Sequence, residues 1–208
     1  MRTAEIRKQI KAALDDERRT NRLRGILVQM ANARGLKPSA QDLEGALAFI
    51  REYIEHVPAS MEAIAAAAPK IGDQAQLQHL LSAAEQYWFA TLDFIPDHIG
   101  LTGLLDDAYY VLSLMHGISE GYRQRTGSSL LSPDFATANA AMRVLIGEPH
   151  ASLLDTSIAT AQQGPALQNL INQIVRGMGQ PMNVPDPIWG NASIDEIVNA
   201  RMGAMGIV

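Results

Sequence analysis

The sequence of 208 residues contains no cysteine. This absence excludes a disulfide scaffold, a zinc site built on thiolates and a cysteine nucleophile. Aromatic residues make up only 5% of the chain and charged residues only 19%. Hydrophobic residues nevertheless reach 47%, so the chain can form a sizeable core and does not have the composition of a disordered protein.

Long apolar runs are also missing. A helix that crosses a bilayer needs roughly 20 mostly apolar residues. The longest uncharged stretch, residues 156–175, is interrupted by glutamines, asparagines, a glycine and a proline. The N-terminus lacks the continuous apolar core of a secretion signal. We therefore predict a cytoplasmic protein, with peripheral attachment to a membrane as an open alternative.

Positive charge is unevenly distributed along the chain. Residues 1–34 contain nine basic and four acidic residues, a net charge of +5, whereas residues 35–208 contain eight and eighteen, a net charge of −10. No lysine or arginine lies between Lys70 and Arg123, although that interval contains seven acidic residues. The chain thus combines a basic N-terminal segment with an acidic remainder.

The spacing of apolar residues is helical almost throughout, and no sustained run of alternating β-branched residues occurs. Thr3 is a plausible start for one long helix that ends at about Ala33. Ser39 begins a second helix, which Pro58 is expected to end. Ser193 and the glutamate three residues later form a capping-box pattern for a short last helix. The sequence predicts an all-α, compact bundle of about seven to nine helices.

Three segments are expected within a single domain. Residues 1–34 form a basic N-terminal helix, residues 35–176 form a helical body, and residues 177–208 form a strap rich in glycine and proline with a short C-terminal helix. A helix–turn–helix hairpin over residues 74–121 occupies the centre of the body.

One segment, residues 86–115, carries a specific motif. It contains an aspartate, an apolar pair, Pro-Asp, an eight-residue spacer that includes a glycine, and Asp-Asp. The motif residues in this chain are Asp93, Pro96, Asp97, Gly103, Asp106 and Asp107. The segment resembles the YkvA-like bacterial family, a domain of unknown function. This resemblance implies a compact helix–turn–helix unit that is often linked to membranes, and it implies no established reaction.

The segment departs from the family pattern at three positions. Thr91 and Gly100 stand where the family often has proline, and His98 stands where it usually has an apolar residue. These differences predict a turn that is softer and more polar than in the family.

The aspartates of the motif have two interpretations. Asp106 and Asp107 follow a predicted helix start, where free N–H groups and the helix dipole favour negative charge, so the carboxylates can pin the turn. Alternatively, a divalent cation such as Mg²⁺, Mn²⁺ or Ca²⁺ binds there and activates a water molecule. The ligands would be Asp93, Asp97, His98 and Asp106 or Asp107. We expect no cofactor on the first interpretation.

Other catalytic patterns are missing. The sequence contains no zinc-protease, serine-hydrolase or phosphate-loop motif. Glu52 and His56 lie four residues apart on one helix face, and we interpret them as surface residues. His79 lies within an apolar helical stretch, and we interpret it as a packing residue.

The basic N-terminal helix has three candidate partners: the acidic body of the same or a second copy, an anionic membrane surface, or nucleic acid. Acidic residues 15–17 interrupt the positive charge, which argues against nucleic acid. The residues expected to contact an anionic partner are Arg7, Lys8, Lys11, Arg18, Arg19 and Arg22.

Taken together, the residues predict a non-enzymatic helical interaction or regulatory module that binds a protein partner, self-associates or lies at a membrane surface. The alternative is a metal-dependent enzyme of the hydrolase type. It would use the cluster of Asp93, Asp97, His98, Asp106 and Asp107.

Overall fold

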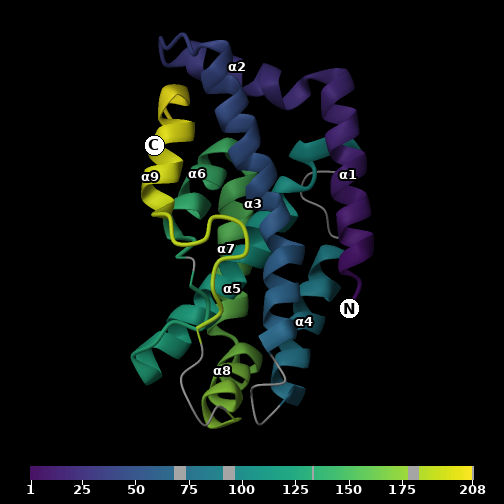
Figure 1. Cartoon of the computed structure of the whole chain (residues 1–208), viewed down its shortest axis with the longest axis vertical. Helices are drawn as coiled ribbons and strands as arrows, with labels where there is room; N and C mark the ends of the chain where they lie inside the picture. The colour runs from purple at the N-terminus through teal and green to yellow at the C-terminus, as the bar shows by residue number, and fades with distance from the viewer. Residues whose placement is uncertain (68–73, 91–96, 133, 178–182, 208) are drawn as a thin grey trace.

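The computed structural model describes residues 1–67, 74–90, 97–132, 134–177 and 183–207 (Figure 1). These residues form helices and no strand, so the predicted all-α fold is confirmed. The α-helices are α1 (Thr3–Thr20), α2 (Arg22–Ala33), α3 (Ala40–Ala67), α4 (Gln74–Trp88), α5 (Leu105–Thr126), α6 (Ala136–Ile146), α7 (His150–Gln163), α8 (Pro165–Gly177) and α9 (Ile194–Met202). Two 3₁₀ helices, η2 (Asp97–Thr102) and η3 (Gly203–Met205), complete the set.

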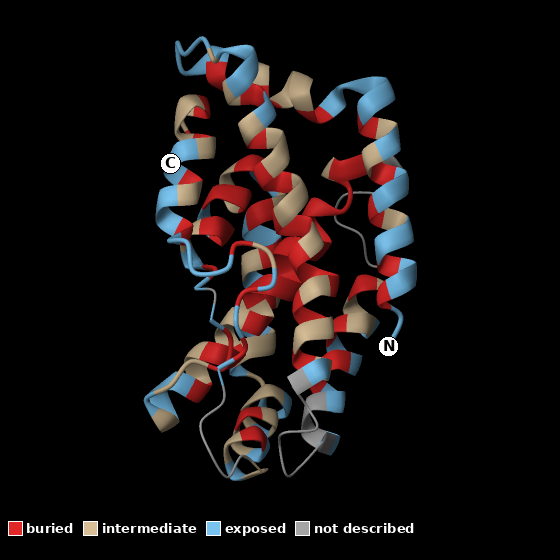
Figure 2. Cartoon of the chain, in the orientation of Figure 1, coloured by how far each residue is buried: buried red, intermediate tan, exposed pale blue. Residues whose placement is uncertain are grey.

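Helices α3 and α5 form the centre of the bundle (Figures 1 and 2). Helix α3 packs against α1, α2, α4, α5 and α9, and α5 packs against α4, α6, α7 and α8. Phe49, Tyr53 and Ile54 of α3 are fully buried. Each large apolar side chain that is removed from water contributes about 1.5–3 kcal/mol, so the central pair dominates the stability of the fold.

The expectation that Pro58 ends a helix is wrong, because α3 continues through it to Ala67. An internal proline lacks the N–H for one backbone hydrogen bond and costs about 3 kcal/mol. Val57, Met61 and Ile64, which lie on either side of it, are fully buried. Their burial outweighs the cost of the proline.

The single helix expected over residues 3–33 is divided into α1 and α2 at Asn21, whose φ of 48° is left-handed. Asparagine is one of the few residues that tolerate this conformation. The buried carboxylate of Glu17 accepts hydrogen bonds from the backbone N–H groups of Leu23 (2.9 Å) and Arg24 (3.1 Å) and so caps the start of α2. We call residues 17–24 the elbow.

Two of the predicted helix starts are confirmed. Ser39 and Asp42 form a reciprocal capping box, in which Ser39 N donates to Asp42 Oδ2 at 2.7 Å and Asp42 N donates to Ser39 Oγ at 3.2 Å. These hydrogen bonds lower the pKa of the Asp42 carboxyl. At the start of α9, Ser193 Oγ accepts a hydrogen bond from Glu196 N at 3.4 Å.

Residues 183–193, which we call the strap from here on, contain no helix and cross the surface beside α3 and α6 (yellow in Figure 1). The strap is attached to the segment before α6 by backbone hydrogen bonds. Ser132 N donates to Val184 O at 2.7 Å, and Val184 N donates to Leu130 O at 2.9 Å. This attachment places the strap over the polar residues that precede α6.

Candidate functional site

Part of the predicted acidic site falls outside the described residues. Asp93 and Pro96 are not among them, and of Asp97 and His98 only the backbone, which lies in η2, is described. The proposed role of Asp93, Asp97 and His98 as metal ligands therefore stays a prediction.

The remaining motif residues, Gly103, Asp106 and Asp107, are buried. Gly103 is buried between η2 and α5, and Asp106 and Asp107 in the first turn of α5 expose only 2% and 5% of their surface. The N-terminus of a helix favours negative charge at this position. Across the described ranges, no set of three or more His, Asp or Glu side chains is arranged to hold a metal ion.

Helix α1 packs against η2, so the N-terminal helix docks on the acidic body of the same chain, one of the three partners considered from the sequence. Gly100 of η2 has a φ of 74° and a ψ of −141°, a conformation almost restricted to glycine. A Cβ atom at this position would lie 2.9 Å from Asp16 Oδ2 of α1. Gly100 thus lies at a point where α1 and η2 are in close contact.

The N-terminus also supplies polar contacts to the interval that lacks lysine and arginine. Arg2 N donates a hydrogen bond to Glu85 of α4. The Arg2 guanidinium lies 3.7 Å from the centre of the Phe89 ring, a cation–π arrangement.

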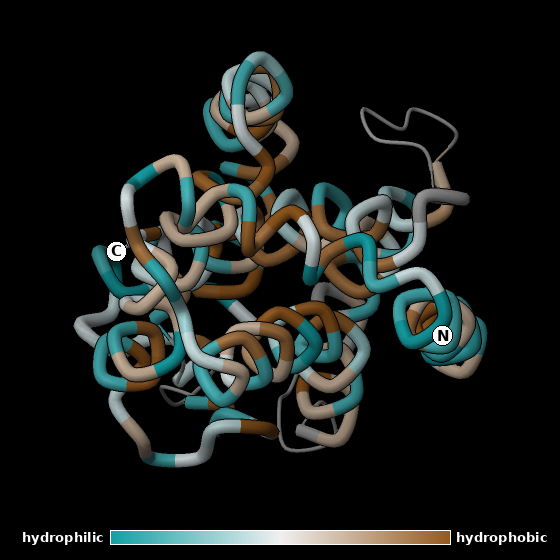
Figure 3. The backbone as a smooth tube through the Cα atoms, turned by 90° about the horizontal axis from the view of Figure 1, so that it is seen from above, coloured by the Kyte–Doolittle hydropathy of each residue, from teal (hydrophilic) through white to brown (hydrophobic). Residues whose placement is uncertain are grey.

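Helix α1 is amphipathic and lies at the edge of the molecule (Figures 1 and 3). Ile6 and Ile10 are buried against the body, with exposed fractions of 0% and 3%. The opposite side of α1, together with the adjoining start of α2, is exposed (Figure 2). We call its cationic residues the basic face: Lys8, Lys11, Arg18, Arg19 and Arg22.

Arg7 does not belong to the basic face. Its Nη2 atom lies 2.6 Å from Glu62 Oε2 of α3, and this hydrogen-bonded pair raises the pKa of Arg7 and lowers that of Glu62. Arg7 therefore helps to attach α1 to the body. An ion pair between Arg24 and Glu44 attaches α2 to α3 in the same way.

The basic face is only partly neutralised. Arg18 and Arg19 pair with Asp15 (2.9 Å) and Asp16 (2.6 Å), each three residues earlier in α1. Within the described part of the chain, Lys8, Lys11 and Arg22 form no ion pair. Surface pairs of this kind contribute at most about 1 kcal/mol, so the guanidinium groups stay available to an external anion.

A second polar centre lies beneath the strap, and sequence reasoning missed it. His56 is completely buried, so its interpretation as a surface residue is wrong. Its Nε2 lies 3.1 Å from Asp186 Oδ1 and its Nδ1 lies 2.7 Å from the carbonyl oxygen of Glu52. Both ring nitrogens of His56 thus lie within hydrogen-bond distance of an oxygen atom. His79 is exposed rather than packed, so that prediction is also wrong.

Asp186 is the point at which the strap is held. Its Oδ1 atom accepts hydrogen bonds from the backbone N–H groups of Ile188 and Trp189, both at 2.8 Å, in addition to the bond with His56. Burial by itself would raise the pKa of the Asp186 carboxyl, but these hydrogen bonds outweigh it and hold the pKa below its usual range.

Trp189 anchors the strap on α3. Its ring stacks on Phe49, with centroids 5.3 Å apart and planes within 3°, and lies 4.1 Å from the His56 ring. Its Nε1 atom donates a hydrogen bond to Glu52 Oε2 at 2.8 Å, and Arg201 of α9 binds the same oxygen. The strap, α3 and α9 are thus joined through Glu52.

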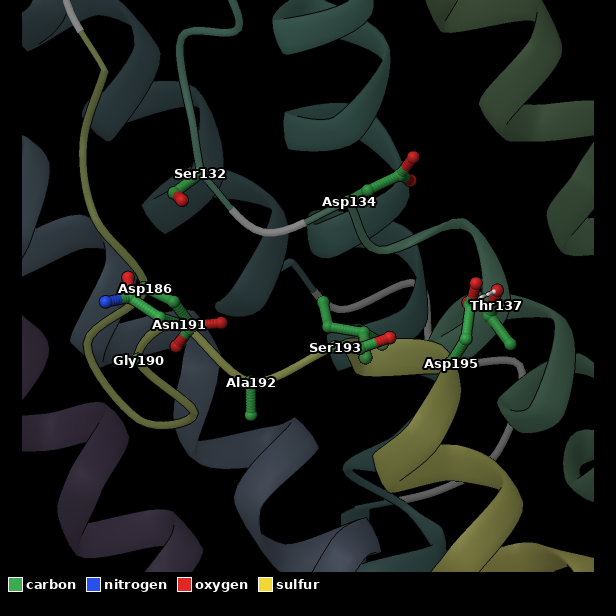
Figure 4. Close-up of a pocket in the computed structure, with 10 residues that line it drawn as sticks. Ser132, Asp134, Thr137, Asp186, Gly190, Asn191, Ala192, Ser193 and Asp195 are labelled. Atoms are coloured by element: carbon green, nitrogen blue, oxygen red, sulfur yellow. Dashed lines mark hydrogen bonds between the residues drawn. The ribbon is translucent and has the colours of Figure 1, made fainter.

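A polar cavity of about 420 Å³ opens beside this cluster, between the strap, the start of α6 and the start of α9 (Figure 4). Among the described residues that line it, Asp134, Asp186 and Asp195 are acidic and none is a lysine or arginine. Thr137 of α6 donates a hydrogen bond to Asp195, which bridges the two helices across the cavity. We call it the strap cavity.

Comparison of the chain with protein-family models, with curated proteins and with solved structures finds no match. The resemblance to the YkvA-like family accordingly stays a prediction from the motif in residues 86–115.

Proposed function

We propose that the protein is a non-enzymatic helical module that attaches to an anionic membrane surface through the basic face of α1. The observation that carries this proposal is the orientation of α1. Its apolar side is used within the protein, so the exposed cations on its other side are available to an external partner. None of the described helices is apolar over a sufficient length to cross a bilayer, so the proposed attachment is peripheral.

The net charge of the basic face determines how strongly the protein is expected to bind an anionic membrane. The five cationic residues together with Asp15 and Asp16 carry a net charge of +3. Each basic residue near an anionic leaflet contributes about 1 kcal/mol, so the face contributes about 3 kcal/mol, a factor of roughly 150 in partitioning. Attachment of this strength is reversible and depends strongly on salt.

Nucleic acid is the less favoured partner. The carboxylates of Asp15 and Asp16 lie among the cations of the face, and the body behind it carries a net charge of −10. A stable complex with a nucleic acid commonly neutralises many phosphates at once. The resemblance to the YkvA-like family, which implies a link to membranes, also supports the lipid surface.

Co-sedimentation with lipid vesicles tests the proposal. We expect the protein to bind phosphatidylserine-containing vesicles at about 0.01 M salt, where charges interact over about 30 Å, and to be released at about 1 M salt. The double substitution Lys8→Glu/Lys11→Glu changes the net charge of the face from +3 to −1 and should abolish binding.

The matched control is Arg34→Glu/Lys37→Glu, which alters the charge of the whole chain equally at two exposed residues outside the basic face. It should retain most of the binding. Equal loss in both double variants, binding that persists at high salt, or binding to duplex DNA in preference to the vesicles would contradict the proposal.

A metal-dependent hydrolase is the second candidate, because two adjacent buried carboxylates, Asp106 and Asp107, lie in the first turn of α5, the next helix after η2, which contains Asp97 and His98. This candidate predicts that Mg²⁺, Mn²⁺, Ca²⁺ or Zn²⁺ raises the melting temperature of the protein, since an ion that binds only the folded state stabilises it. Asp97→Asn should remove the shift, whereas Asp134→Asn in the strap cavity should retain it. An unchanged melting temperature with all four ions would eliminate the hydrolase.

A further inference from the structure

A third feature of the surface is an open cavity of about 300 Å³ at the elbow, lined by the end of α1, the start of α2, the first half of α3 and η2. We call it the elbow cavity. Its volume is that of about ten water molecules in the liquid, at the small end of ligand pockets. Leu14, Leu47, Ala48 and Leu101 form its apolar wall.

Three arginines from three helices line the polar side of the elbow cavity: Arg18 of α1, Arg24 of α2 and Arg51 of α3. Two carboxylates, Glu17 and Glu44, also line it. Both are engaged within the protein, since Glu17 caps α2 and Glu44 pairs with Arg24.

The other two arginines, Arg51 and Arg18, form weaker ion pairs within the protein. The guanidinium of Arg51 lies 3.9 Å from Glu52 Oε1, beyond hydrogen-bond distance, and the second oxygen of Glu52 already binds Trp189 and Arg201. Arg18 pairs with Asp15, which does not line the elbow cavity, and 75% of its side chain is exposed. The elbow cavity thus presents two guanidinium groups beside an apolar wall.

We propose that the elbow cavity binds a phosphate monoester group that is joined to a short apolar chain. The guanidinium is planar and matches the oxygens of phosphate with paired N–H donors, and two such groups balance the charge of −1.5 to −2 that a monoester carries near neutral pH. The apolar wall accommodates the first carbons of the attached chain. A ligand with a carboxylate in place of the phosphate would bring less negative charge to the guanidinium groups of Arg18 and Arg51.

This ligand has two natural sources, a soluble alkyl phosphate or the headgroup of phosphatidic acid. The second source deepens the proposed function, because Arg18 belongs both to the basic face and to the elbow cavity. Stable attachment to a membrane commonly needs two signals, and the elbow cavity would add a specific contact to the non-specific charge of the face.

Calorimetric titration with hexyl phosphate, hexanoate and inorganic phosphate tests whether the elbow cavity binds a soluble alkyl phosphate. Hexyl phosphate should bind at least about tenfold more tightly than either of the others, because only it combines the dianion with the chain. Arg51→Gln should weaken binding by about tenfold to a hundredfold, the usual effect of losing a charged hydrogen-bond donor. Ala48→Leu, which keeps all three arginines but fills the wall, should weaken it similarly.

The control is Lys37→Gln, which removes one exposed cation outside the elbow cavity and should bind hexyl phosphate as the unaltered protein does. Thermal melts monitored by circular dichroism establish that each variant is folded. Equal affinity for hexyl phosphate and inorganic phosphate, or unchanged affinity in Arg51→Gln, would overturn the proposal.

Vesicles of equal surface charge distinguish the sources. Preference for phosphatidic acid over phosphatidylserine, lost in Arg51→Gln, identifies the lipid, whereas binding of hexyl phosphate without that preference identifies a soluble ligand. The two proposals fail separately. Lys8→Glu/Lys11→Glu should abolish vesicle binding but leave hexyl phosphate binding unchanged. Arg51→Gln should weaken hexyl phosphate binding but leave binding to phosphatidylserine vesicles largely unchanged.

Discussion

Replacement of Asp186 by alanine is expected to lower the free energy of unfolding by about 3–5 kcal/mol, because it leaves three groups without their carboxylate partner and each unsatisfied buried group costs about 1–3 kcal/mol. The substitution leaves the fully buried His56 without its carboxylate. It also removes the acceptor of two backbone N–H groups, those of Ile188 and Trp189. Urea denaturation measures the effect.

The control for this substitution is Asp134→Ala in the same strap cavity. The Asp134 side chain is 78% exposed and accepts one hydrogen bond from Ala136 N at 2.9 Å. Its loss should cost about 1 kcal/mol or less. If the two variants were equally stable, the His56–Asp186 pair would not hold the strap.

The same carboxylate makes stability depend on pH in acid. The folded-state pKa of Asp186 lies below the unfolded value, which is about 3.9. Its contribution is therefore fully present above that value and is lost as the pH falls through the folded-state pKa. The titration of Asp186 should leave the difference in stability between the unaltered protein and Asp186→Ala constant from about pH 5 upward. It should shrink below about pH 4. A difference that stayed unchanged in acid would contradict this assignment.

Replacement of Trp189 by alanine should destabilise the protein by about 3–5 kcal/mol, the range for loss of a buried large aromatic side chain. Trp189 is 8% exposed, stacks on Phe49 and donates to Glu52. Trp189→Phe is the matched control, because it retains a ring against Phe49 and loses only the Nε1 hydrogen bond. It should cost about 1 kcal/mol beyond any change in packing. A small effect of Trp189→Ala in urea denaturation would show that the strap contributes little to folding.

The two strap substitutions should not be additive. Asp186 accepts the backbone N–H of Trp189, and both residues contact His56. Residues that share partners commonly couple by about 0.5–3 kcal/mol. The double variant should therefore lose less stability than the two single variants combined, whereas full additivity would mean that the two contacts act independently.

Local sequence signals were sufficient for much of the secondary structure. The helices that begin at the Ser39–Asp42 capping box and at Ser193 were predicted because a cap depends on residues within one turn of each other. The predictions that failed depend on distant residues. Pro58 is accommodated by the burial of its neighbours, and the bend at Asn21 is stabilised by the carboxylate of Glu17.

The candidate sites also combine features that the local sequence indicates with features that depend on distant residues. The basic residues of α1 were identified from composition, but only the tertiary structure shows that Arg7 pairs with Glu62 of α3. His56 and Asp186 are 130 positions apart, and no local pattern relates them. The motif aspartates were recognised by spacing, whereas the burial of Asp106 and its neighbour follows from the arrangement of the helices around them.

Residue types and their short-range spacing were therefore enough for the all-helical class, the exclusion of thiol chemistry and the unequal distribution of charge, because each depends only on composition or on contacts within a few turns. Tertiary packing determined the rest. It placed α1 against η2, brought three arginines from three helices to the elbow cavity and attached the strap to His56 through Asp186. The physical reason is that burial and charge pairing join residues far apart in the chain, and their free energies depend on geometry that a linear pattern does not contain.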